Sequence, residues 1–243
     1  MTYCLGILLT SGLVMAADSR SNAGIDDFTS VYKLDLIDVP GKRVIVILSA
    51  GNLATTQSVI TQLREYSDHG GPRDLHKVKT MYEAAKAVGD TLREVIARDG
   101  SYVAPYGSAA GSFIVGGQIA GEAPRLFQIY TAGNFIEASP RSRYLQLGET
   151  KYGKPILDRA LRFDSPLDQA AKLALLSFDA AMRSDLSVAM PIDILRYEAD
   201  SFCSTNRASL EKDDPYWSAL RTAYGDGLAA LVERLPPPPD WSA

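Results

Sequence analysis

The chain opens with an apolar hairpin pattern that starts directly behind a threonine. Residues 3–9 and 13–18 are almost entirely apolar, and a Ser11-Gly12 turn separates them. Two such runs joined by a short glycine-containing turn predict two antiparallel strands. Removal of Met1 would leave Thr2 with a free α-amine and a hydroxyl on one residue. With a pKa of about 8, the amine can accept the proton of that hydroxyl, which is the N-terminal threonine form of nucleophilic catalysis.

Composition and charge exclude several classes of function. The 243 residues are 46% hydrophobic and 22% charged, which predicts one globular domain over residues 1–235 and a proline-rich C-terminal tail over 236–243. A net charge of −4 argues against nucleic acid or an anionic membrane as a partner. The apolar run at residues 1–17 lacks the basic segment of a secretory signal, and no segment reaches the roughly 20 apolar residues of a membrane span. We therefore expect a cytoplasmic protein.

The cysteines and histidines are too few and too far apart for a metal site. Cys4 and Cys203 are typical of reduced thiols, and Cys4, within an apolar run, is expected to be a small buried hydrophobic residue. His69 and His76 share a polar segment without metal-ligand spacing, and no Gly-x-Ser-x-Gly turn exists for a serine nucleophile. We expect no metal and no cofactor.

Strand patterns alternate with helical patterns along the rest of the chain. A polar loop is predicted over residues 20–29, and a Ser165-Pro166 pair and Asp74 are expected to begin helices. Strands are predicted at 31–37, 44–48, 113–115, 126–130 and 135–136, and a further strand is predicted to begin with residues 187–190. Helices are predicted after Gly51 and over 78–96, 166–182 and 214–231. This order predicts an α+β fold, a four-layer αββα sandwich.

Three features farther along the chain lie where a threonine nucleophile needs partners. Asp18-Ser19-Arg20 ends the second strand and places an acid and a base on the hairpin partner of the Thr2 strand. Lys33 stands among apolar residues, where its charge would lower the pKa of the threonine hydroxyl and keep the amine neutral, with Asp18 as counter-ion. Gly51 lies between a strand and a helix, where backbone N–H groups can approach an oxyanion.

Each feature also has an ordinary interpretation. Asp18 and Arg20 could form a surface ion pair worth roughly 0–1 kcal/mol. Lys33 could extend its ammonium group from a strand edge into water. Gly51 could be a simple turn residue. Taken singly, each favours the ordinary interpretation, whereas their order and spacing behind Thr2 favour the catalytic one.

That order resembles a known family over essentially the whole chain. Thr2, Gly6, Asp18, Arg20, Lys33 and Gly51 follow the pattern of proteasome β-subunits and their bacterial relatives. Within that group the chain looks like the Anbu subfamily of bacterial proteasome-like peptidases. The segments that carry this likeness are Met1-Thr2-Tyr3-Cys4-Leu5-Gly6, Asp18 to Gly24, Met182 to Val188 and Met190-Pro191-Ile192-Asp193.

The resemblance implies roles for individual residues and an N-terminal-nucleophile αββα fold. Thr2 would be the nucleophile, Asp18 and Lys33 its charged partners, Gly51 the oxyanion donor, Arg20 a structural support and Ser187 the residue that orients the amine. The chain departs from the family pattern at two positions. Ser184 stands where an aspartate is usual, and Glu149 replaces a serine that follows a strand glycine. Asp185 or Glu149 could substitute electrostatically.

The expected function is a threonine-type peptidase or amidase that forms an acyl-enzyme on Thr2 after removal of Met1. Its substrate would be a peptide or protein, and the family resemblance implies a homo-oligomeric ring or spiral. The apolar helix at 166–182 is an independent hint of a covered surface. The sequence does not show whether an ATP-dependent unfoldase docks on this assembly. Two alternatives remain: an assembly subunit with a vestigial Thr2, and a transferase that passes an acyl or glutamyl group to an amine.

Overall fold

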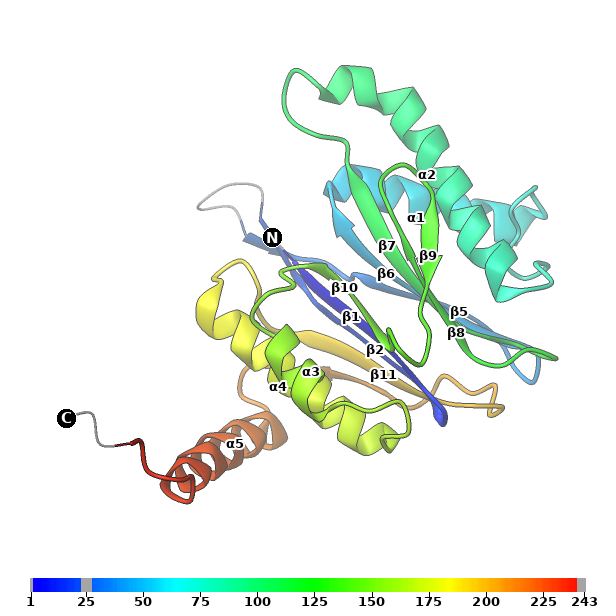
Figure 1. Cartoon of the computed structure of the whole chain (residues 1–243). Helices are drawn as coiled ribbons and strands as arrows, with labels where there is room; N and C mark the ends of the chain where they lie inside the picture. Colours follow the sequence, from blue (N-terminus) through cyan, green and yellow to red (C-terminus); the bar gives the residue numbers. More distant parts are fainter. Residues whose placement is uncertain (1, 23–27, 240–243) are drawn as a thin grey trace.

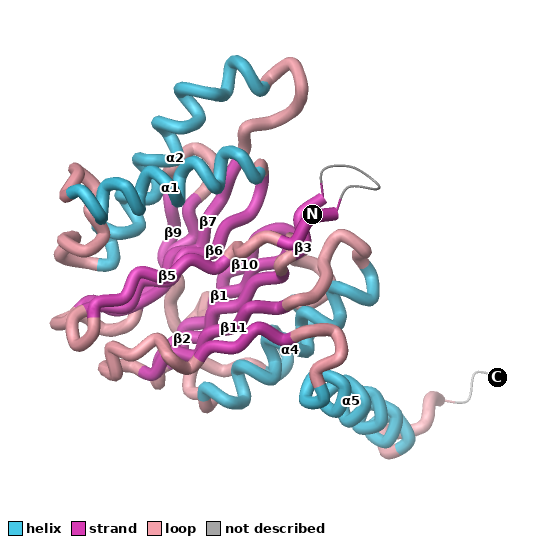
Figure 2. Tube along the Cα trace, turned by 180° about the vertical axis from the view of Figure 1, so that it is seen from behind, coloured by secondary structure: helices cyan, strands magenta, loops and turns pink. Residues whose placement is uncertain are grey.

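Two antiparallel sheets stack face to face, and helices cover their outer surfaces (Figure 1). The computed structural model describes residues 2–22 and 28–239. The first sheet has the order β10-β1-β2-β11-β12 and the second β5-β6-β7-β8-β9. Figure 2 shows the helices on the two outer sides with the strands between them. The predicted αββα sandwich is therefore confirmed.

The elements have the following bounds. The first sheet contains β1 (Tyr3–Leu9), β2 (Gly12–Asp18), β10 (Tyr144–Gly148), β11 (Ile192–Glu198) and β12 (Arg207–Leu210). The second contains β5 (Leu34–Val39), β6 (Arg43–Gly51), β7 (Gly111–Ile119), β8 (Arg125–Ile129) and β9 (Phe135–Glu137). A separate pair is formed by β3 (Arg20–Asn22) and β4 (Phe28–Ser30). The helices are α1 (Leu53–His69), α2 (Met81–Val103), α3 (Lys154–Ala160), α4 (Leu167–Ser184) and α5 (Pro215–Glu233).

The central strands β1 and β2 are buried on both faces, which explains their continuous apolar runs. Side chains alternate between the faces of a strand. Cys4 and Leu8 accordingly join the core between the sheets. Leu5 and Ile7 join the core beneath α3 and α4. A third core lies beneath α1 and α2 on the second sheet.

Several local predictions differ from the structure. The strand predicted to begin with residues 187–190 exists as β11, but its predicted start is wrong. Residues 187–190 form a loop, because Asp185 accepts hydrogen bonds from Ser187 and strand pairing starts only at Ile192, opposite Asp18. The predicted polar loop at 20–29 contains β3 and β4, which pair Arg20 with Ser30, while residues 23–27 lie outside the described residues.

Two predicted helix caps are also wrong, and one is confirmed. The side chain of Thr80, not of Asp74, accepts from the first turn of α2, because Asp74 belongs to a separate turn in which it accepts from His76 N. No side chain caps α4, since Ser165 accepts from Arg162 N instead. Asp214 caps α5 as predicted, by accepting from Tyr216 N and Trp217 N.

The C-terminal tail has no regular secondary structure where the structure describes it. Residues 236–239 of the predicted tail are neither helix nor strand, and the rest of that tail lies outside the described residues. The single domain over 1–235 stays a prediction. Within the described ranges, no helix is both long and apolar enough to cross a bilayer.

We expect two glycines of α2 to respond oppositely to alanine. A Cβ on Gly89 would lie 2.2 Å from Gly133 O, so Gly89→Ala forces the helix away from the β8–β9 turn and should lower stability by about 1–3 kcal/mol. A Cβ on Gly100 meets only Ile96 Cγ2, at 3.5 Å, so Gly100→Ala should raise stability by up to about 1 kcal/mol. Urea unfolding measures both, and equal effects would contradict this close packing.

The two thiols should differ sharply in reactivity. Burial raises the pKa of Cys4 to about 12, whereas hydrogen bonds from Thr205 lower the pKa of the exposed Cys203. At pH 8 a disulfide reagent should therefore titrate Cys203 in the native protein and Cys4 only in guanidinium. Cys203→Ser should abolish the native reaction, and a thiol that still reacts in this variant would show that Cys4 is accessible.

Candidate active site

Thr2, Asp18 and Lys33 meet where the two sheets come together. Thr2 directly precedes β1, and Asp18 is the last residue of β2 in the same sheet. Lys33 directly precedes β5, which belongs to the other sheet. The β1–β2 register pairs Cys4 with Ala17, so Asp18 lies one step along, beside Tyr3, whose N–H donates to Asp18 Oδ1 at 2.9 Å. The hairpin thus sets the position of the threonine through main-chain pairing.

The three side chains form one buried hydrogen-bonded group. Thr2 Oγ1 donates to Asp18 Oδ1 at 2.8 Å, and Lys33 Nζ lies 2.8 Å from the same carboxylate oxygen. Lys33 Nζ also donates to Thr2 Oγ1 and to the carbonyl of Arg20. The exposed fractions are only 8% for Thr2, 0% for Asp18 and 6% for Lys33. The hydroxyl therefore sits between a cation and an anion, away from bulk water.

The donors of Lys33 determine what it can do chemically. An ammonium group has three N–H donors and no acceptor, and here all three are directed at oxygen atoms, those of Thr2, Asp18 and Arg20. As an ammonium group in this arrangement, Lys33 can stabilise negative charge on the threonine oxygen and offers no acceptor for the hydroxyl proton.

Arg20 supports this group through its backbone and its side chain. Its N–H donates to Asp18 Oδ2 at 3.3 Å, and its carbonyl accepts from Lys33. Its guanidinium donates to Leu186 O at 2.6 Å and so connects β3 to the loop after α4. Arg20 therefore contacts both charged side chains of the group, and its supporting role stays a prediction.

The loop after α4 carries a second carboxylate. Asp185 Oδ1 accepts from the backbone N–H of Ser187 at 2.8 Å and from its hydroxyl at 2.5 Å. Burial opposes ionisation of Asp185, but these hydrogen bonds hold its pKa below its usual value. Its Oδ2 is buried and has no hydrogen-bond partner within residues 2–22 and 28–239. Ser184 is exposed at the end of α4 and carries no carboxylate. The carboxylate that the family pattern expects near this position is therefore supplied by Asp185.

Glu149 contacts the threonine through its backbone only. Its N–H donates to Thr2 O at 2.8 Å, which extends the β1–β10 pairing by one step. Its buried side chain accepts from Lys151 N at 2.8 Å. Glu149 therefore anchors the main chain of Thr2, and one oxygen of its carboxylate, Oε1, accepts a hydrogen bond within its own loop.

The backbone conformation and the close packing at Gly51 leave no room for a residue with a side chain. Its φ is +114°, and a Cβ would lie 2.4 Å from Ala110 O. Ser49 N donates to Lys33 O on one side of β6, and Asn52 N donates to Ala110 O on the other. N–H groups alternate along a strand, so the N–H of Gly51 points to the same side as that of Ser49, toward the segment that carries Lys33.

A cavity of about 410 Å³ borders this site and was not predicted from the sequence. It lies between β5, β6 and α1, and Val31, Tyr32 and Ser49 of its wall neighbour Lys33 and Gly51 in the chain. Burial raises the pKa of its Asp35, and the ion pair with the more exposed Arg64 opposes this rise. The sequence feature that could have indicated this cavity is Asp35 itself, a charged residue within the strand Leu34–Val39.

Cys4 is excluded as a competing nucleophile. It is fully buried between the sheets, and its thiol donates to Ser49 O at 3.4 Å. Burial raises its pKa to about 12, so the thiolate is scarce at neutral pH. Among the described residues, no cluster of three or more His, Cys, Asp or Glu side chains could hold a metal ion.

Comparisons with known proteins place the chain in a family. The proteasome subunit family model matches residues 2–195. A solved helical assembly of the Anbu complex from Pseudomonas aeruginosa is 48% identical, covers 99% of this chain and 100% of its own, and superposes with a TM-score of 0.94. Anbu, the ancestral beta-subunit, from Yersinia bercovieri is 45% identical with a TM-score of 0.93, covering 98% of this chain and 99% of its own. Proteasome subunit beta 2 of Pyrococcus furiosus is 25% identical over 217 residues, 87% of this chain and 94% of the relative. The chain therefore belongs to the proteasome subunit family and, within it, to the Anbu group of ancestral beta-subunits.

Proposed function

We propose that this protein is a threonine-type peptidase or amidase in which Thr2 is the nucleophile once Met1 has been removed. The observation that carries the proposal is the buried contact of the Thr2 hydroxyl with Lys33 and Asp18. A hydroxyl between an ammonium and a carboxylate can develop negative charge that the protein already compensates. Membership in the proteasome subunit family agrees with this assignment.

The free α-amine of Thr2 is the base in this proposal. Lys33 has no free acceptor, so the amine takes the hydroxyl proton, directly or through water, while the oxygen attacks the substrate carbonyl carbon. Lys33 stabilises the threonine oxygen as its charge develops. The N–H of Gly51 binds the oxyanion of the tetrahedral intermediate. The leaving amine takes the proton, and water then hydrolyses the threonine ester.

Asp185 and Ser187 position the amine in this mechanism. Within residues 2–22 and 28–239 the Oδ2 of Asp185 has no hydrogen-bond partner, which suits it to accept an N–H of the Thr2 amine, and Ser187 holds the carboxylate by two hydrogen bonds to Oδ1. In this proposal Asp185 takes over the role of the aspartate that the family pattern places at residue 184. Ser187 acts through Asp185 rather than on the amine itself.

The adjoining cavity is the proposed site for a substrate side chain. Its volume of about 410 Å³ suits a single large side chain, and its wall combines Val31, Leu53 and Ile60 with the Asp35–Arg64 pair. Peptides or proteins are accordingly the proposed substrates.

We also propose that the active form is a homo-oligomer. The relative from Pseudomonas aeruginosa, 48% identical over nearly the whole chain, was solved as a helical assembly. The number of subunits and the closure of the assembly are not part of this proposal.

Acylation of Thr2 is the first testable consequence. Intact mass spectrometry should find a protein without Met1 that gains one β-lactone adduct, whereas Thr2→Ala should gain none. Thr2→Ser keeps a hydroxyl beside the amine and should still react. Retention of Met1, or a processed Thr2 that stays unmodified, would contradict the peptidase proposal and favour an assembly subunit with a vestigial threonine.

Gly51→Ala tests the oxyanion donor. The added Cβ meets Ala110 O at 2.4 Å and displaces the N–H, so acylation of Thr2 by the β-lactone should slow by about 10²–10³-fold. Gly41→Ala is the matched control, because Gly41 also has a positive φ, +71°, but a Cβ there meets nothing within 4 Å. Both variants carry backbone strain, and only Gly51→Ala should lose reactivity. Equal rates in the two variants would remove Gly51 from the mechanism.

A further inference from the structure

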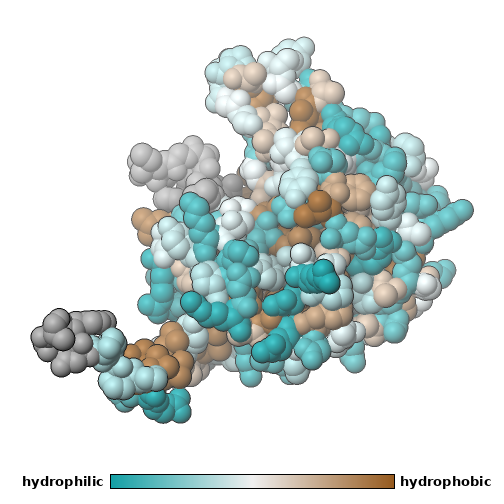
Figure 3. Space-filling view, in the orientation of Figure 1, coloured by the Kyte–Doolittle hydropathy of each residue, from teal (hydrophilic) through white to brown (hydrophobic). Residues whose placement is uncertain are grey.

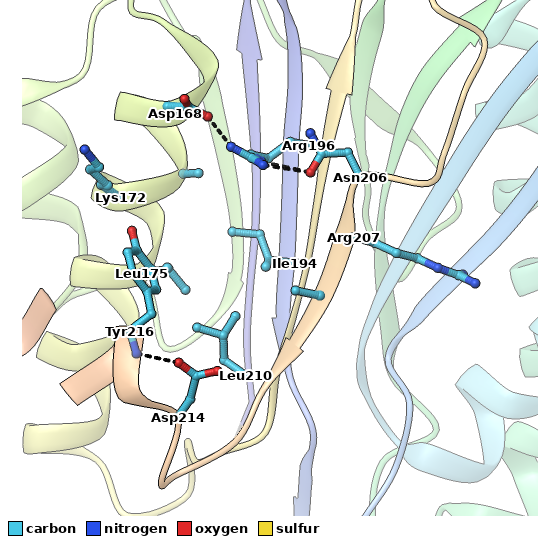
Figure 4. Close-up of a pocket in the computed structure, with 12 residues that line it drawn as sticks. Asp168, Lys172, Leu175, Ile194, Arg196, Asn206, Arg207, Leu210, Asp214 and Tyr216 are labelled. Carbon is cyan, nitrogen blue, oxygen red and sulfur yellow. Dashed lines mark hydrogen bonds and ion pairs between the residues drawn. The ribbon is translucent and has the colours of Figure 1, made fainter. Parts of the chain in front are cut away.

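Two cavities of similar size contain an aspartate–arginine pair, and one of them borders the candidate active site. The first, of about 410 Å³, lies between β5, β6 and α1 and contains Asp35 and Arg64. The second, of about 440 Å³, lies between α4 and β12 and contains Asp168 and Arg196 (Figure 4). It is at the base of α5, which extends away from the body (Figure 1) and shows apolar surface at the lower left of Figure 3. The second cavity is therefore a reference against which the first can be tested.

The strand register places Asp35 at a defined distance from the proposed oxyanion donor. Asp35 pairs with Ile47 of β6, which precedes Gly51 by four residues, about 13 Å along a strand. Ser49 lies between these two positions of β6 and lines the cavity. A substrate whose carbonyl oxygen is bound at Gly51 would extend its side chain into the cavity from that end. A short side chain ends before Asp35, whereas the long stem of lysine or arginine carries its charge to the carboxylate.

The two members of the first pair differ in how firmly they are held. The side chain of Asp35 is only 15% exposed and belongs to a strand of the second sheet, whereas that of Arg64 is 63% exposed on α1. Arg64 donates to Asp35 Oδ1, and in the part of the chain that the structure describes no residue donates to Oδ2. The carboxylate is thus a fixed part of the cavity with one oxygen available to a further donor. The exposed guanidinium can move into water.

The rest of the cavity wall is neutral and partly apolar. Asp35 and Arg64 are the only charged residues among the described residues that line it. Burial raises the pKa of Asp35, so a second cation beside Oδ2 would favour the ionised carboxylate. An acidic side chain would be repelled by the same carboxylate. Apolar wall residues suit the aliphatic stem of a basic side chain, which packs readily while its charged end is paired. These apolar residues are Val31, Leu53 and Ile60.

We propose that Asp35 is a specificity-determining residue that selects lysine or arginine on the carbonyl side of the cleaved bond. The ammonium or guanidinium of the substrate donates to Asp35 Oδ2, and Arg64 moves into water as that side chain enters. This inference rests on the proposed peptidase function and names its substrate class, peptide bonds that follow a basic residue. It adds no step to the chemistry at Thr2.

Two peptide probes that differ in charge test this selection. Each carries a vinyl sulfone at the position of the cleaved bond, one after arginine and the other after citrulline, which has nearly the same length and shape but is neutral. Intact mass spectrometry of the whole protein without Met1 gives the rate at which each probe modifies Thr2. The wild type should react about 10-fold faster with the arginine probe, because a hydrogen bond between two charged groups is stronger than one with a neutral donor.

Three variants assign the selection to the first cavity. Asp35→Asn should bring the ratio of the two rates to about 1, because its amide no longer attracts a cation, and its reaction with citrulline reports a folded protein. Arg64→Gln removes the competing cation from an exposed position, so it should raise the ratio above that of the wild type. Asp168→Asn is the matched control, because it removes the aspartate of the pair in the second cavity (Figure 4) and should keep the wild-type ratio.

The outcomes separate this inference from the peptidase proposal. Equal rates of the two probes in the wild type, or reaction with the β-lactone alone, would overturn the inference and leave the nucleophile in place. A ratio that Asp35→Asn leaves unchanged, or that Arg64→Gln does not raise, would also overturn it, as would a loss of selection in Asp168→Asn. A wild type whose Thr2 reacts with neither probe nor with the β-lactone would overturn both proposals.

Discussion

The buried contact between Lys33 and Asp18 joins the two sheets at the candidate active site. Asp18 ends β2 of one sheet and Lys33 precedes β5 of the other, with their side chains 0% and 8% exposed. Taking two charges out of water is costly unless further hydrogen bonds compensate. Here Tyr3 N and Arg20 N donate to the carboxylate, and the carbonyl of Arg20 accepts from the ammonium. Removal of either partner would leave an uncompensated buried charge, which typically costs about 3–5 kcal/mol.

The hydroxyl of Thr2 contacts both members of this pair, so the stability of the fold and the proposed chemistry depend on the same atoms. Main-chain pairing holds the threonine from two sides, since β2 lies beside β1 on one edge and Glu149 N donates to Thr2 O on the other. A nucleophile at a chain end would normally be mobile, because terminal residues are seldom ordered unless they are tied down. The sheet supplies that restraint here and holds the proposed nucleophile Thr2 in a defined position.

The candidate site was predictable where a polar residue interrupts an apolar pattern. Asp18 at the end of an apolar run and Lys33 among apolar residues are unusual enough in sequence to suggest partners for Thr2. The loop after α4 was harder, because its geometry depends on side-chain hydrogen bonds. Counting residues pointed to Ser184, whereas the carboxylate that accepts from Ser187 is that of Asp185. The Asp35–Arg64 pair was missed because its partners lie 29 residues apart, on β5 and α1.

The sequence by itself determined the strands of the first hairpin, the long helices and the layered class of the fold. These follow from the period of apolar residues and from turn residues, which act over a few positions. Tertiary structure alone decided the start of β11, the pairing of β3 with β4, the orientation of Gly51 N–H and the overhang of α5. Each of these depends on which distant segment lies alongside. A local pattern can show that a face is apolar, but only packing shows what covers it.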